Sequence, residues 1–266
     1  MHSPLTFLSS LLITTMDSTS SAGSPNGSPS AGRVLITPVQ AGVVSTLCMV
    51  LIAAFVVNYV YAQACIAKFS EIRVSLAAVA ASAARTLSGQ PGEEHKQLKS
   101  SDQMGTPLHA KLLAPLVQIH KVTPEIYYIY TAIQLAPNDY RIILDTTTNA
   151  AELNLTRKVE PSPIMEKYES ARPEMKAALE KGDISTTPEF YTDRFGTFIS
   201  AYAPFTGADT RIAGVVGVDM DRDTVLAQMD GPARQAIIQI CVLGIVALAV
   251  GYGVYLSRKK ALAGVA

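Results

Sequence analysis

The sequence predicts an α+β fold, in which an antiparallel sheet and a long N-terminal helix are flanked by two transmembrane helices. Three observations predict this fold. Two long apolar segments without charged residues lie towards the ends of the 266-residue chain. Between them, residues 125–148 and 196–220 each contain two runs rich in β-branched and aromatic residues, joined by a polar turn, which is a hairpin pattern. Other segments repeat apolar residues at helical spacing, and helices grouped around hairpins are typical of an α+β domain.

The two apolar segments are each long enough to cross a bilayer. No charged residue lies between Arg33 and Lys68, and none lies between Arg234 and Arg258. About 20 helical residues cross the hydrocarbon core of a membrane. Neither segment shows the polar stripe of an amphipathic helix on the surface of a soluble protein. We therefore predict transmembrane helices at 39–63 and 235–257, with one domain at 64–234 between them.

The tails predict the orientation of the chain. Long loops cross membranes largely regardless of charge, so the basic residues at 258–260 should keep the short tail 258–266 in the cytoplasm. The domain would then lie on the outer side. Residues 1–33 are rich in Ser, Gly and Pro, which predicts a disordered tail, and either Met1 or Met16 would serve as the start.

Composition argues against several classes of function. The net charge is zero and no Lys/Arg stripe is interleaved with aromatic residues, so we expect no nucleic-acid partner. The histidines lack metal-ligand spacing, and the motifs of hydrolases, P-loop proteins and dinucleotide enzymes do not occur. Cys48, Cys65 and Cys241 lie in or beside the spans, which leaves the domain without a cysteine pair. We expect no enzyme, no cofactor and no metal.

Within the domain, the first span should continue outwards as one helix until glycine and proline break the pattern near residue 88. Pro115 is expected to kink or restart the next helix, and Gly182 to cap the end of a third. The expected elements are helix 69–87, helix 107–121, strands 125–135 and 140–148, helix 161–182, strands 196–205 and 211–220, and a short helix from 222 into the second span.

The strand at 211–220 ends at a carboxylate. Side chains alternate between the faces of a strand, so Asp219 shares its face with small residues, while the opposite face is bulky and apolar. A buried carboxylate needs hydrogen-bond donors or a cationic ligand. Two interpretations stay open: a structural hydrogen bond to a loop, or contact with a ligand. Asp221 is expected to cap the helix that follows.

Other polar side chains on the strands and at their ends are candidates for the same site. Tyr128 and Tyr130 share one face, which suits either the wall of a small polar pocket or ordinary sheet packing. Ser200 and Tyr202 share a face and have the same two interpretations. For Asp145, a role in capping a turn is favoured over a ligand contact. The full set of candidate ligand-binding residues is Tyr128, Tyr130, Asp145, Tyr191, Ser200, Tyr202 and Asp219.

Three motifs are similar to those of a known family. The chain has YxYT at 128–131, DxFGxFISAYAP at 193–204 and GVVGVD at 214–219, after a membrane span and a long helix. Together they resemble the single Cache domain, the extracytoplasmic, PAS-like sensor module of bacterial membrane receptors. The similarity covers about residues 65–235, and the second hairpin is its most specific part. It implies a PAS-like sheet that holds a small ligand, such as an amino acid, an amine or a carboxylate.

The resemblance leads to a functional hypothesis and its alternatives. We expect a periplasmic sensor in the bacterial inner membrane, a homodimer through the long helix, acting through a separate signalling partner because only ten residues follow Leu256. The aspartate and tyrosines favour amino or cationic ligands. One alternative is a membrane-tethered interaction protein whose pocket is filled by its own side chains. Another is a fragment of a histidine kinase, chemoreceptor or cyclase. The free volume beside Asp219 and Tyr130 separates the sensor from the interaction protein.

Overall fold

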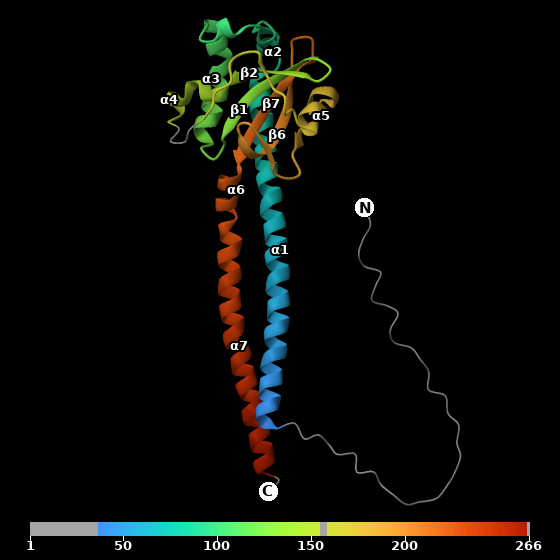
Figure 1. Cartoon of the computed structure of the whole chain (residues 1–266), viewed down its shortest axis with the longest axis vertical. Helices are drawn as coiled ribbons and strands as arrows, with labels where there is room; N and C mark the ends of the chain where they lie inside the picture. The colour runs from blue at the N-terminus through green and yellow to red at the C-terminus, as the bar shows by residue number, and fades with distance from the viewer. Residues whose placement is uncertain (1–36, 155–158, 265–266) are drawn as a thin grey trace, which may run out of the picture.

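The computed structural model describes residues 37–154 and 159–264, which form an α+β domain on a stalk of two helices (Figure 1). Helix α1 (Pro38–Leu87) is a single helix of 50 residues that runs from the predicted first span into the domain. Helix α7 (Asp230–Ala263) returns alongside it, so the start of α1 and the end of α7 lie together, far from the sheet. The predicted tail at 1–33 lies outside the described residues.

Helix α1 begins at a well-defined cap. The Thr37 hydroxyl accepts a hydrogen bond from the Gln40 amide, and the Gln40 side chain accepts one from the Thr37 amide, which together form a capping box before Pro38. Both stalk helices are long and apolar enough to cross a membrane, and their most apolar windows are only 6% and 11% buried. Such exposure is unlike the core helix of a soluble domain and is compatible with contact with lipid.

The rest of the chain adds short helices and one sheet to this stalk. Its elements are α2 (Gln90–His95), η1 (Ser101–Gln103), α3 (Pro107–Val122), β1 (Tyr128–Ala136), β2 (Asp139–Asp145), η2 (Thr146–Asn149), α4 (Ala150–Leu153), β3 (Glu166–Lys167), α5 (Pro173–Lys181), β4 (Ser185–Thr186), β5 (Tyr191–Asp193), β6 (Gly196–Thr206), β7 (Ile212–Asp221) and α6 (Arg222–Gln228).

The strands form one antiparallel sheet in the order β3-β2-β1-β7-β6-β4, with β5 paired to β6. The two predicted hairpins are confirmed, and they pair with each other through β1 and β7. The register places Asp219 opposite Tyr128 on one side and opposite Ser200 on the other. Three candidate residues from distant parts of the sequence therefore meet across neighbouring strands.

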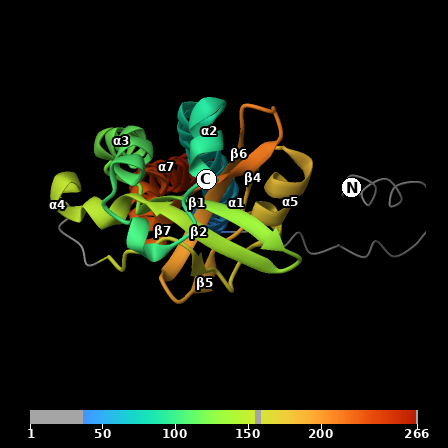
Figure 2. The same ribbon diagram turned by 90° about the horizontal axis from the view of Figure 1, so that it is seen from above.

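Two separate cores cover the two faces of the sheet. Helices α1, α2 and α3 lie on one side and β5 on the other (Figure 2). The core under α1 and α3 is aliphatic and includes Leu76, Leu116 and Val218. The opposite core contains six tyrosines, together with Met175 and Ala178 of α5. The predicted alternation of faces is confirmed, since Val216 and Val218 enter the first core and Val215 enters the second.

Several predicted boundaries are wrong. The expected helix at 161–182 is helical only over Pro173–Lys181, although Gly182 caps it with a positive φ of 79° as predicted. Before it, the amides of Met165 and Tyr168 bond to carbonyls of β2, because pairing with a sheet edge outweighs the local helical pattern. Two prolines, at 161 and 163, also disfavour a helix there.

Other differences are smaller. Strand β2 stops at Asp145, whose side chain accepts the Thr147 amide and turns the chain into η2 instead of extending the strand to 148. Helix α3 continues through Pro115 without a break in its assignment. Helix α7 starts before the predicted span and continues to Ala263, so most of the expected tail is helical.

Candidate functional site

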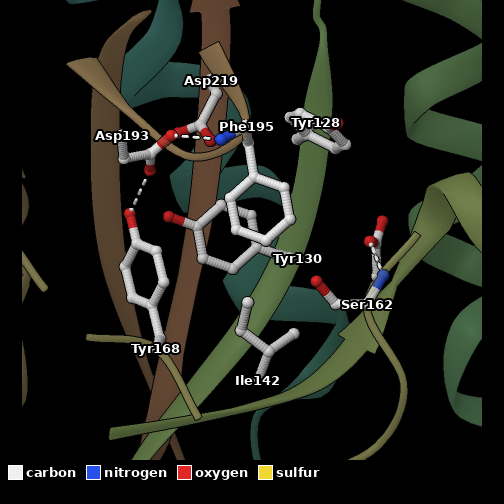
Figure 3. Close-up of a pocket in the computed structure, with 9 residues that line it drawn as sticks. Tyr128, Tyr130, Ile142, Ser162, Tyr168, Asp193, Phe195 and Asp219 are labelled. Carbon is white, nitrogen blue, oxygen red and sulfur yellow. Dashed lines mark hydrogen bonds between the residues drawn. The ribbon is translucent and has the colours of Figure 1, made fainter. Parts of the chain in front are cut away.

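A small cavity lies on the tyrosine-rich face of the sheet (Figure 3). Its floor comes from β1, β2 and β7, and its cover comes from the segment after β3 and the turn between β5 and β6. Nine residues line it: Tyr128, Tyr130, Ile142, Asp145, Ser162, Tyr168, Asp193, Phe195 and Asp219. Its volume is about 20 Å³, which is room for about one water molecule. Pockets that hold small organic ligands are typically about 300–1,000 Å³, so the walls nearly fill this site.

Gly217 leaves space for the ring of Tyr130, which forms one wall of the cavity. The ring of Tyr130 lies so close to Gly217 that a Cβ atom there would be 2.4 Å from the Tyr130 Cζ. The Tyr130 hydroxyl is buried and has no hydrogen-bond partner among the described residues. It points towards the side of the site where Asp193 and Tyr168 lie (Figure 3). A buried hydroxyl without a partner is costly, which makes it a candidate contact for a ligand or a water molecule.

Asp219 is held by one side-chain donor. The Ser200 hydroxyl donates to Asp219 Oδ1 at 2.6 Å. Behind it, the Tyr191 hydroxyl lies 2.9 Å from Ser200 Oγ and 3.4 Å from the Tyr202 hydroxyl. The structural hydrogen bond expected for Asp219 therefore exists, but its donor lies on the neighbouring strand and not in a loop. Burial raises the pKa of Asp219 well above its ordinary value, the Ser200 hydrogen bond lowers it, and the nearby charges of Asp193 and Asp145 raise it further.

Asp145 has more partners. Its Oδ1 accepts hydrogen bonds from the amide and the hydroxyl of Thr147, at 2.9 and 2.7 Å, and its Oδ2 accepts the Ser162 amide at 2.8 Å. The predicted turn-capping role is confirmed, and the same side chain lines the cavity. Burial raises its pKa to about 6, and these hydrogen bonds limit the rise.

The cavity is electronegative. Three of its nine lining residues are aspartates, and none is Lys, Arg or His. Burial raises the pKa of Tyr128 to about 12 and keeps Tyr130 and Tyr168 protonated as well. The tyrosines therefore supply neutral hydroxyls beside the carboxylates. A small cation with hydrogen-bond donors is the chemical class that complements such a site.

The sequence candidates fall into two groups. Tyr128, Tyr130, Asp145 and Asp219 line the cavity, whereas Tyr191, Ser200 and Tyr202 form the hydrogen-bonded row behind Asp219. That any of them binds a ligand stays a prediction. The predicted set of site residues missed Ile142, Ser162, Tyr168, Asp193 and Phe195. Only Asp193 and Phe195 had a signal, since both lie in the motif DxFGxF.

The histidines of the domain are buried in its interior. His95 is buried at the end of α2, its Nε2 is 2.8 Å from Thr131 Oγ1, and burial lowers its pKa to about 3. His120 bonds to Thr146 and to the Ile126 carbonyl. In the part of the chain that the structure describes, no group of three or more His, Cys, Asp and Glu residues is placed to hold a metal ion.

Comparison with known proteins adds a fold-level similarity. No family model and no curated protein matches the chain. The arrangement resembles solved sensor domains of chemoreceptors and histidine kinases. The ligand-binding domain of the Campylobacter jejuni chemoreceptor Tlp3, in complex with 4-methylisoleucine, has a TM-score of 0.40 and 13% identity over 69% of this chain. The E. coli DcuS sensor domain has a TM-score of 0.40 and 16% identity over 59% of this chain and 97% of its own length. The match spans 63% of the Tlp3 domain, less than two thirds of it. The functional argument therefore rests on the geometry of the site.

Proposed function

We propose that this chain is a membrane-anchored sensor whose outer domain binds a small cationic ligand, an amine or the ammonium group of an amino acid, at Asp219. The observation that carries the proposal is the meeting of Asp145, Asp193 and Asp219 around a cavity with no basic side chain in its lining. Buried carboxylates without a cationic partner cost folding free energy, and groups with such perturbed pKa values gather at functional sites. A ligand ammonium would supply the missing positive charge.

The path from this site to the stalk is short and supports a role in signalling. Asp219 lies two residues before Asp221, whose side chain caps α6 by accepting from the Thr224 amide and hydroxyl. Helix α6 leads directly into α7. Helix α1 packs against β6 and β7, and α6, which leads into α7, contacts the same two strands. A ligand that pulls on β7 would shift both helices, provided that it binds one conformation better than the other.

The remaining parts of the proposal concern location and partners. The apolar stalk helices would cross the bacterial inner membrane as a two-pass anchor, with the domain in the periplasm. Two copies would pair along the outer part of α1, and a separate protein would receive the signal. The exposed face of α1 outside the membrane, which includes Val74 and Ala78, is the surface that supports this pairing.

Thermal melting of the full-length chain in nanodiscs tests ligand binding. The panel contains amines, amino acids, carboxylates and purines, and we expect a shift only with compounds that carry an ammonium group. A ligand at 100 times its dissociation constant adds about 2.7 kcal/mol to the free energy of unfolding. Asp219→Asn should abolish the shift while the protein still folds.

Tyr130→Phe provides the second variant for this test. Because its hydroxyl has no partner, its removal should change the stability by less than about 1 kcal/mol while weakening the response to the ligand. A shift of unchanged size in both variants would place the ligand elsewhere. A shift with simple carboxylates alone would contradict the choice of ligand class.

A second candidate function is favoured by the size of the cavity. At about 20 Å³, the space beside Asp219 and Tyr130 is nearly solid, as expected for a membrane-tethered interaction protein without a ligand. If no compound in the panel shifts the melting temperature of a well-folded protein, this second function replaces the first. Asp219 would then be a structural residue held by Ser200.

A further inference from the structure

The outer wall of the cavity is built from two short segments. Tyr168 follows β3, which pairs with β2 through only two residue pairs. Asp193 and Phe195 lie at the turn from β5 into β6, and β5 pairs with β6 through three residue pairs. These segments are anchored far more weakly than the floor strand β7, which pairs with β6 through nine residue pairs. If any wall of the site moves, these two segments are the ones held by the fewest backbone hydrogen bonds.

Side chains join the two segments across the mouth of the cavity. The Tyr168 hydroxyl donates to Asp193 Oδ2 at 3.0 Å (Figure 3). The Arg194 guanidinium forms an ion pair with Glu166. The turn is held in shape by the Phe195 amide, which donates to Asp193 Oδ1 at 2.9 Å. We call Glu166, Tyr168, Asp193 and Arg194 the entrance latch.

Beside the entrance latch lies a second, larger hollow. It has a volume of about 450 Å³ and is lined by Glu166, Lys167, Tyr168, Glu169, Ser170 and Arg194. Tyr168 lines both this hollow and the buried cavity, so its side chain lies between them. Movement of Tyr168 together with the β5–β6 turn would join the two spaces and uncover the carboxylates behind.

The side-chain contacts that form the entrance latch are weak. Arg194 is about half exposed, at 49% of its side-chain area, and exposed ion pairs contribute little to stability because water screens them. The second oxygen of Glu166 is buried and has no hydrogen-bond partner among the described residues, so this carboxylate is only partly satisfied in the closed arrangement. Opening would release it to water.

We propose that the entrance latch controls the entry of ligands to the site, and that Glu166 and Arg194 limit access to Asp219 although neither lines the cavity. This inference rests on the proposed function, because controlled entry matters only if a ligand binds. A cavity of about 20 Å³ admits no organic ligand while these four residues keep their contacts. Ligand binding therefore requires the latch to open first.

Thiol modification from within the cavity tests the proposal without any knowledge of the ligand. Ser162 lines the cavity, and Ser162→Cys is a nearly isosteric reporter. The protein is the full-length chain in nanodiscs, with Cys48, Cys65 and Cys241 replaced by alanine so that only the reporter reacts. The probe is 2-aminoethyl methanethiosulfonate, a small cationic reagent that is too large for the closed cavity.

Each change that removes one contact of the latch should speed the reaction. We expect Arg194→Gln, Glu166→Gln and Tyr168→Phe to raise the rate of modification by about three- to tenfold. The double variant with Glu166→Gln and Arg194→Gln should react at about the rate of either single variant, because both remove the same ion pair. Arg194→Lys, which keeps the charge, should lie close to the parent rate.

The matched control breaks an equivalent ion pair elsewhere. Lys121→Gln removes the exposed pair with Glu152 and should leave the rate unchanged. The melting temperature of each variant distinguishes local opening from loss of the fold. Unchanged rates in all three latch variants, with the fold intact, would overturn the proposal. The thiol assay contains no ligand, so its result is independent of the melting experiments with the ligand panel. Either proposal, the entrance latch or ligand binding, can therefore be contradicted while the other is supported.

Discussion

The two faces of the sheet use the same strands in different ways. On β7, Val218 is fully buried in the aliphatic core under α1, while its neighbour Asp219 is buried among tyrosines on the other side. Helices α1 and α3 cover the first face with aliphatic side chains. The second face leaves an unpartnered hydroxyl and carboxylates without a basic residue in the cavity. This difference supports the proposal that one face supplies stability and the other binds a ligand.

The largest effect is expected from the aliphatic face. Leu76 on α1 is fully buried, so Leu76→Ala should lower the free energy of unfolding by about 2–5 kcal/mol. Urea unfolding of the full-length chain, followed by tyrosine fluorescence, measures it. Val122→Ala at the end of α3 is the control, because Val122 is 78% exposed and its truncation should cost less than about 0.5 kcal/mol. Equal costs for the two variants would show that α1 does not hold the domain core.

Acidification should change the free energy of unfolding in opposite directions through the two faces of the sheet. His95, on the helix side, has a folded pKa of about 3 against an ordinary 6.5. Below pH 6.5 the unfolded chain binds a proton that the folded chain excludes, so acidification from pH 7 to pH 4 destabilises the fold through His95 by about 3 kcal/mol. Asp145, on the tyrosine side, has a folded pKa of about 6 against 3.8. Here the folded chain binds the proton first, so the same acidification stabilises the fold by about 2 kcal/mol.

Two variants separate these contributions. Relative to the parent protein, His95→Gln should gain stability between pH 7 and pH 4, and Asp145→Asn should lose it. The measured quantity is the change with pH in the difference between variant and parent, which cancels the other titrating groups. If both variants changed in the same direction, the assigned burial of one of the two side chains would be wrong.

The smallest effect on stability is expected where the tyrosine face is tightest. A methyl group at Gly217 would press on the Tyr130 ring, which could yield only by moving into the cavity. Gly217→Ala should therefore cost about 1–3 kcal/mol and abolish the melting shift with ammonium ligands. Calorimetry with the ligand panel measures both quantities. A normal ligand response in this variant would argue against a site beside Tyr130.

The sequence predicted much of the fold because its signals are local. The two long apolar helices, the four long strands and the alternation of β7 follow from patterns within single segments. The first part of the helix expected at 161–182 was wrong because β3 forms by pairing with β2, a contact between distant parts of the chain that no local pattern records. For the same reason Tyr168 was missed, and Ser200 was not identified as the donor to Asp219 although both were named as candidates.

By itself, the sequence determined the two apolar helices, the pair of hairpins and the identity of the side chains on each strand face. These features depend on residues close together in the chain, where spacing fixes direction. The tertiary structure alone decided that Asp145, Asp193 and Asp219 converge, that the cavity between them is only about 20 Å³, and that Glu166 and Arg194 form an ion pair. These features depend on strand register and on how two surface segments pack, and small shifts in either would change which charges meet.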